Sequence, residues 1–151
     1  MASRYDATAQ CRVGRMDETQ FYAEADEQTG DFFRSLVRSW RSSGGTLQWG
    51  AGGVGLRGVV DGKVVGLCFL APAYAGKKDR IELSCSSLTR SLGATAVEQL
   101  LAALKKAAGT QYRGTSMISI VDPGRLAPAS REHLAATICG ILRPYRGPAV
   151  G

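Results

Sequence analysis

Two β-prone segments joined by the dipeptide Asp61-Gly62 constrain the fold of this chain more than any other feature of its sequence. A two-residue turn of this kind places both residues at positive φ, and its twist matches that of two antiparallel strands. The sequence therefore predicts a β-hairpin with strands over residues 54–60 and 63–70. The turn also sets which residues lie opposite each other in the two strands.

Counting back from the turn assigns each strand residue to one face of the hairpin. Leu56 is expected opposite Leu67, and Val54 opposite Phe69, on the face that meets the core. The other face is less polar than a fully solvated sheet surface. In this register its apolar members are Val59, Val64 and Cys68. Such a composition favours partial burial of that face, for example in a homodimer.

The remaining elements follow from hydrophobic periodicity and capping patterns. Alternation predicts further strands at 46–49, 80–86 and 116–121. Helical spacing predicts helices at 18–28 and 32–42, separated by Thr29-Gly30-Asp31, with Asp31 capping the second. Two more helices are expected, one capped by Thr95 and closed by Gly109, the other capped by Ser130 and ended by Pro144. The prediction is a two-layer α+β fold with a mostly antiparallel sheet, a four-strand meander plus a fifth strand, and helices on one face.

The length of 151 residues is that of one domain. We expect an N-terminal arm over residues 1–16, one α+β domain over 17–146 and a frayed tail over 147–151. The chain has no apolar run of membrane-spanning length and no signal-peptide pattern at its start. Its four cysteines are widely spaced and are interpreted as free thiols of a cytoplasmic protein, with a disulfide as the alternative. They are Cys11, Cys68, Cys85 and Cys139.

Charge is distributed unevenly along the chain. Residues 1–31 hold three basic and seven acidic side chains, a net of −4, and residues 32–151 hold sixteen basic and six acidic, a net of +10. This basic body indicates nucleic acid or an acidic protein as a partner. The residues expected to bind such an anion are Arg34, Arg38 and Arg41, at helical spacing, with Lys77 and Lys78 assisting. The alternative is a solvated helix face whose arginines pair with acids of the preceding helix, such as Glu24, Asp26 and Glu27.

Motifs for catalysis or cofactor binding are weak. Residues 50–55 match G-x-G-x-x-G, but β-prone sequence follows them instead of the helix that a dinucleotide site needs. We therefore interpret them as a glycine-rich turn between strands. His133 is the only histidine, and no pair of residues has zinc-ligand spacing. The sequence thus predicts no cofactor and no metal.

The leading functional prediction is a non-enzymatic binding or regulatory domain, with a basic surface for nucleic acid or an acidic protein. Two alternatives remain. The first is a small enzyme, hydrolase or nuclease-like, whose site would form only in the fold. The residues it would bring together are Asp79, Glu82, Ser84, Cys85 and His133. The second is a homodimeric protein-interaction module that buries the less polar face of the hairpin.

Overall fold

The computed structural model describes residues 16–73 and 77–145. Within them the chain forms six strands and five α-helices with short 3₁₀ segments. The helices are α2 (Glu18–Glu24), α3 (Glu27–Ser42), α4 (Cys85–Leu92), α5 (Ala94–Ala108) and α6 (Pro128–Cys139), with 3₁₀ turns at Gly109–Gln111, Pro123–Arg125 and Gly140–Tyr145. The strands are β1 (Thr46–Trp49), β2 (Val54–Val60), β3 (Lys63–Ala71), β4 (Arg80–Ser84), β5 (Tyr112–Arg113) and β6 (Met117–Val121). The predicted α+β class is confirmed, with one strand more than expected.

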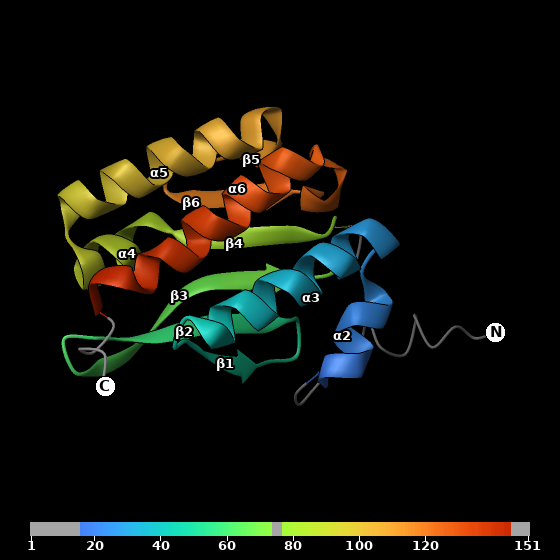
Figure 1. The fold of residues 1–151 in the computed structure, drawn as a ribbon, viewed down its shortest axis with the longest axis horizontal. Helices are drawn as coiled ribbons and strands as arrows, with labels where there is room; N and C mark the ends of the chain where they lie inside the picture. Colours follow the sequence, from blue (N-terminus) through green and yellow to red (C-terminus); the bar gives the residue numbers. More distant parts are fainter. Residues whose placement is uncertain (1–15, 74–76, 146–151) are drawn as a thin grey trace.

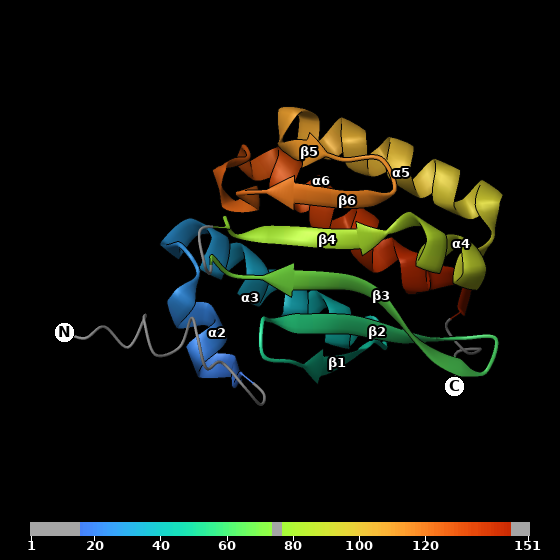
Figure 2. The ribbon, with the colours of Figure 1, turned by 180° about the vertical axis from the view of Figure 1, so that it is seen from behind.

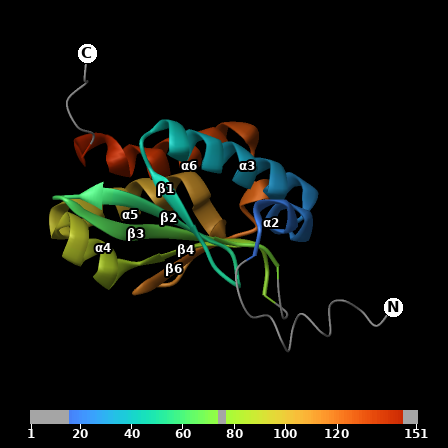
Figure 3. The same cartoon turned by 90° about the horizontal axis from the view of Figure 1, so that it is seen from below.

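The six strands form one sheet in the order β1-β2-β3-β4-β6-β5, and every neighbouring pair is antiparallel. Helices α3, α6 and α5 lie side by side over one face of this sheet (Figure 1). No described helix covers the opposite face of the sheet, as the view from behind shows (Figure 2). In the view from below, the layer of helices α3, α5 and α6 lies on one side of the sheet only (Figure 3). We call the uncovered side the open face.

The hairpin between β2 and β3 forms at the predicted turn, with Asp61 at φ 51° and Gly62 at φ 80°. The predicted register holds only beside the turn. A β-bulge adds Leu67 to β3, so that Leu56 lies opposite Cys68 and Val54 opposite Leu70. The prediction that Cys68 lies on the outer face and Phe69 on the core face is therefore wrong. Cys68 is buried in the core, and Phe69 belongs to the open face.

The break between the first two helices lies earlier than expected. Gly30 is inside α3 and donates its N–H to the carbonyl of Asp26, so Asp31 is not a helix cap. The chain instead turns at Ala25 and Asp26. Asp17 caps α2 by accepting a hydrogen bond of 2.7 Å from the backbone N–H of Gln20.

Two elements were not predicted, and several boundaries move, among them those of α5, which begins at Ala94 without a Thr95 cap, and of α6, which ends at Cys139 before Pro144. The expected strand 80–86 ends at Ser84, whose side chain caps α4, and Cys85 is the first residue of that helix. Strand β5 occupies Tyr112–Arg113, where no strand was predicted. The last helix begins at Pro128, not after a Ser130 cap. Residues 50–53 form the predicted turn between strands, here joining β1 to β2.

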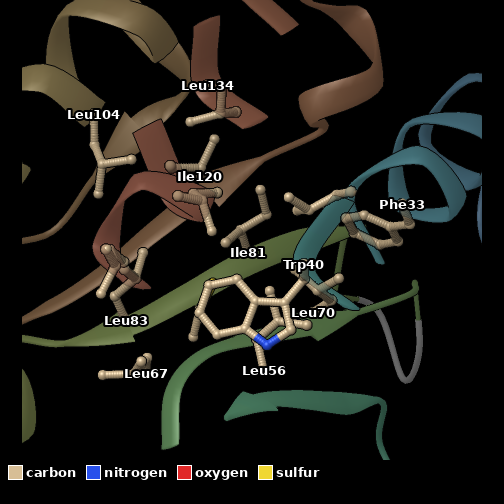
Figure 4. Close-up of a cluster of buried hydrophobic side chains, with 14 of the residues drawn as sticks. Phe33, Trp40, Leu56, Leu67, Leu70, Ile81, Leu83, Leu104, Ile120 and Leu134 are labelled. Carbon is tan, nitrogen blue, oxygen red and sulfur yellow. The ribbon is translucent and has the colours of Figure 1, made fainter. Parts of the chain in front are cut away.

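The core lies between the sheet and the helical layer (Figure 4). Trp40 of α3 is fully buried at its centre and donates its indole N–H to two strand carbonyls, those of Thr46 and Arg57. Gly45 passes so close to this ring that a Cβ atom there would overlap the indole nitrogen. Met16, assigned above to a loose arm, is buried, and its N–H bonds the carbonyl of Gly50 at 2.9 Å. Residues 1–15 of the predicted arm, residue 146 and the whole predicted tail lie outside the described residues.

Candidate functional site

The three arginines predicted to bind an anion lie on α3, where the acidic helix α2 packs against them. Arg41 pairs with Glu18 of α2 at 3.2 Å. Arg34 pairs with Asp31 at 3.3 Å, and its guanidinium lies 4.6 Å from the ring centroid of Tyr22. Arg38 is exposed. Two of the three arginines are thus paired with a carboxylate, Arg41 with an acid of the preceding helix and Arg34 with an acid of α3 itself.

Tyr22 adds to the contact between α2 and α3. Its hydroxyl donates to the Glu18 carboxylate at 3.2 Å. Burial, followed by the charge of Glu18, raises the pKa of Tyr22 to about 12, so the phenol keeps its proton at neutral pH. The tyrosine therefore holds Glu18 in place beside Arg41.

The two predicted lysines lie apart from the arginine stripe. Lys77 and Lys78 are exposed in the connection between β3 and β4, whereas the arginines lie in the helical layer. Lys78 pairs with Asp122 at 3.5 Å. The structure thus divides the five predicted anion-binding residues between two regions, and three of the five are paired with a carboxylate.

The residues of the hypothetical enzyme site do not converge. Glu82 binds Arg80 on the open face, Ser84 caps α4, and the Cys85 thiol donates to the carbonyl of Thr115 at 3.2 Å. His133 is exposed on α6, in the helical layer on the other side of the sheet. Within residues 16–73 and 77–145, no three His, Cys, Asp or Glu residues are grouped to hold a metal ion. None of the described helices has the length and apolar character to cross a membrane.

Asp79, the remaining residue of the hypothetical enzyme site, is held by hydrogen bonds to the backbone. Its buried carboxylate accepts hydrogen bonds from the backbone N–H groups of Asp26 and Ala73, and its own carbonyl accepts from the N–H of Asp122. Burial raises the pKa of this carboxyl, although the two N–H groups act in the opposite direction. Asp79 therefore joins the start of α3 to the β3–β4 connection.

Two shallow grooves flank α6 in the helical layer. One, of about 550 Å³, lies between α3 and α6, with Phe32 and Ser35 on one wall and Glu132 on the other. The second, of about 500 Å³, lies between α5 and α6 and includes His133. Both mix small, apolar and charged side chains without a concentration of one chemistry.

The open face has a more uniform character. Its central feature is a row of six residues, one from each strand, in which each residue lies directly opposite the next on the neighbouring strand. We call this row the central band. The band consists of Gln48, Gly55, Phe69, Glu82, Ser119 and Arg113. At the usual strand spacing it is about 24 Å long. Arg57 and Arg80 lie on either side of it, since each is two residues from a member of the band.

Basic charge predominates on the open face. Glu82 is the only acidic residue in the six described strands, and Arg80 Nε donates to its carboxylate at 2.8 Å. Arg57 and Arg113 add positive charge without an acidic residue on the same strands. Half of the acidic residues in the described part of the chain, six of twelve, instead lie in and beside α2 and in the first turns of α3. The chain therefore separates a basic sheet surface from an acidic helical edge.

Sequence reasoning did not identify this surface. The wrong register assigned Phe69 to the core, and Glu82 was considered only as part of an enzyme site. No family model matches this sequence, and comparisons with curated proteins and with solved structures give no match either.

Proposed function

We propose that this chain is a non-enzymatic binding domain that holds single-stranded nucleic acid on the open face of its sheet. The observation that carries the proposal is the central band, where an aromatic ring lies in a basic surface that no described helix covers (Figure 2). Proteins that bind single strands combine positive charge along the backbone path with aromatic rings on which bases stack. A sheet that exposes an aromatic side chain is one recurring form of this arrangement.

The neighbours of Phe69 favour stacking. Its directly opposite partner on β2 is Gly55, which has no side chain to cover the ring from that side. On the other side stands Glu82, which is held toward Arg80. Phe69 is half-buried, so its position is fixed by the sheet while part of it contacts solvent. A base can therefore contact the part of the ring that is exposed to solvent.

Charge distinguishes this proposal from a homodimer. Val59 and Val64 are 50% and 54% exposed at the hairpin end of the open face, and Met117 is 54% exposed on β6. These apolar residues suit any macromolecular contact. A face-to-face dimer, however, would bring Arg57, Arg80 and Arg113 of one copy against the same three of the other, with only Glu82 to compensate. A polyanion complements the same surface without that repulsion.

The Phe69→Ala variant should bind single-stranded DNA or RNA more weakly by about 1–3 kcal/mol, the usual worth of one stacked base. Fluorescence anisotropy with labelled single strands, titrated at several salt concentrations, measures this loss. Binding by the unaltered chain should weaken steeply as salt rises. Phe69→Leu is the control for packing, because it keeps apolar volume and loses the ring. Equal binding of single strands and duplex, with no effect of Phe69→Ala, would count against the proposal.

The position of the basic contacts gives a second prediction. Replacing Arg57 and Arg113 with alanine should weaken binding more than replacing Arg34, Arg38 and Arg41, although fewer charges are removed. The reason is that two of the α3 arginines are already paired with carboxylates. The same anisotropy titrations compare the two variants, and the salt slope should fall mainly in the first. If the variant without Arg34, Arg38 and Arg41 binds more weakly than the other, the binding site lies on α3 and not on the open face.

A further inference from the structure

The central band places one carboxylate beside the proposed stacking ring, and this carboxylate bears on which bases the surface accepts. Phe69 and Glu82 are direct partners on adjacent antiparallel strands, so their side chains share the open face with Cβ atoms about 4.5–5.5 Å apart. A base stacked on Phe69 therefore presents one edge to Glu82. The hydrogen-bonding groups on that edge must suit a carboxylate.

Arg80 fixes the carboxylate in this position. Its Nε donates to Oε2 of Glu82 at 2.8 Å, and its Nη1 donates to the carbonyl of Lys78 at 3.2 Å. The arginine is thereby held at two points, and the glutamate side chain is 30% exposed. Glu82 consequently offers a charged acceptor of defined position to a ligand on the open face.

We infer that Glu82 makes the open face discriminate against thymine and uracil, an inference that rests on the proposed function. An ionised carboxylate only accepts hydrogen bonds. Cytosine, adenine and guanine each carry an exocyclic amino group that can donate to it. Thymine and uracil carry no amino group, and carbonyl oxygens flank their single ring N–H. The negative carboxylate repels those oxygens.

Backbone flexibility and stacking alone do not predict this preference, because they favour pyrimidine runs without distinguishing cytosine from thymine through hydrogen bonds. A cytosine strand and a thymine strand of equal length are therefore matched probes, because both are pyrimidine strands. We expect the cytosine strand to bind about tenfold more tightly at neutral pH, the effect of one hydrogen bond to a charged acceptor.

The test measures the ratio of the two dissociation constants by anisotropy, in the unaltered chain and in Glu82→Gln. The glutamine amide both donates and accepts, so the ratio should become close to one in this variant. Any general gain in affinity from releasing Arg80 affects both strands and leaves the ratio unchanged. Glu98→Gln is the matched control, since it removes the same charge from an exposed position on α5 and should keep the preference.

The outcomes separate this inference from the proposed function. A preference for cytosine that is lost in Glu82→Gln and kept in Glu98→Gln supports the inference. Equal binding of the two strands by the unaltered chain, or a preference that survives in Glu82→Gln, overturns it and leaves single-strand binding intact. No binding of either strand at low salt overturns the proposed function, and the inference with it.

Discussion

Replacing Trp40 with alanine should lower the free energy of unfolding by about 3–5 kcal/mol, the usual cost of removing a large aromatic side chain from a core. The ring is fully buried between α3 and the sheet. Its indole N–H satisfies the carbonyls of Thr46 and Arg57, at 3.1 and 3.0 Å. The substitution leaves a cavity and removes the hydrogen bonds that join α3 to β1 and β2. Urea denaturation followed by circular dichroism measures the loss.

Two further variants separate the effect of the lost ring from the effect of the lost hydrogen bonds and from that of any surface change. Trp40→Phe keeps most of the buried ring but removes the donor, so it should cost less than the alanine variant and more than a surface change. Arg38→Ala is the matched control on the same helix, because its side chain is exposed and should alter stability by no more than about 0.5 kcal/mol. A Trp40→Ala variant as stable as Arg38→Ala would contradict the central position assigned to this ring.

Replacing Asp79 with alanine should lower the free energy of unfolding by about 2 kcal/mol, because two backbone N–H groups lose their hydrogen-bond acceptor. The variant removes the acceptor for the N–H groups of Asp26 and Ala73, so the start of α3 and the β3–β4 connection lose their common anchor. Thermal unfolding gives the stability change. Hydrogen exchange of the amides at 26 and 73 should accelerate in the variant relative to amides in the core, whereas uniform exchange across the chain would contradict a local anchor.

The same carboxyl predicts a pH dependence with a definite sign. Burial raises its pKa in the folded state, so between the unfolded value of about 3.9 and the folded pKa the folded chain binds more protons than the unfolded one. The contribution of Asp79 to the free energy of unfolding is therefore largest below that window, and it falls as pH rises through the folded pKa. The stability difference between the unaltered chain and Asp79→Asn should accordingly narrow as pH rises from about 4 to 7. A difference that widens over this range would contradict the assigned direction.

The parts of the fold that local sequence determines were predictable. Asp61-Gly62 defines its turn through backbone geometry alone, and the helical spacing of Leu36 and Trp40 locates α3. The register beyond the turn was not predictable in this way. Leu67 and Cys68 are both apolar, so the sequence fits the core equally well with or without an extra residue in β3. In the observed register both residues are buried.

Helix α4 shows a similar ambiguity. Ile81, Leu83 and Cys85 alternate as in a strand, while Cys85, Leu88 and Leu92 have helical spacing, and Cys85 belongs to both patterns. The Ser84 side chain resolves the conflict by accepting from the N–H of Ser87 and starting the helix. The central band was even harder to predict from the sequence than the start of α4. Its members come from six strands, and the pairing of β4 with β6 that completes it spans the whole of α4 and α5.

The strand order also bears on the route by which the chain folds. Strands β1, β2 and β3 are each paired with the next strand along the chain, so the association of β1 to β4 closes only short loops. Packing of α6 against α3, in contrast, joins the two ends of the described chain and is expected late. We therefore expect strands β1 to β4 of a folding chain to pair before its helical layer is complete. At that stage the core face of the sheet is still exposed, so conditions that slow the docking of α6 should favour aggregation over misfolding of the meander itself.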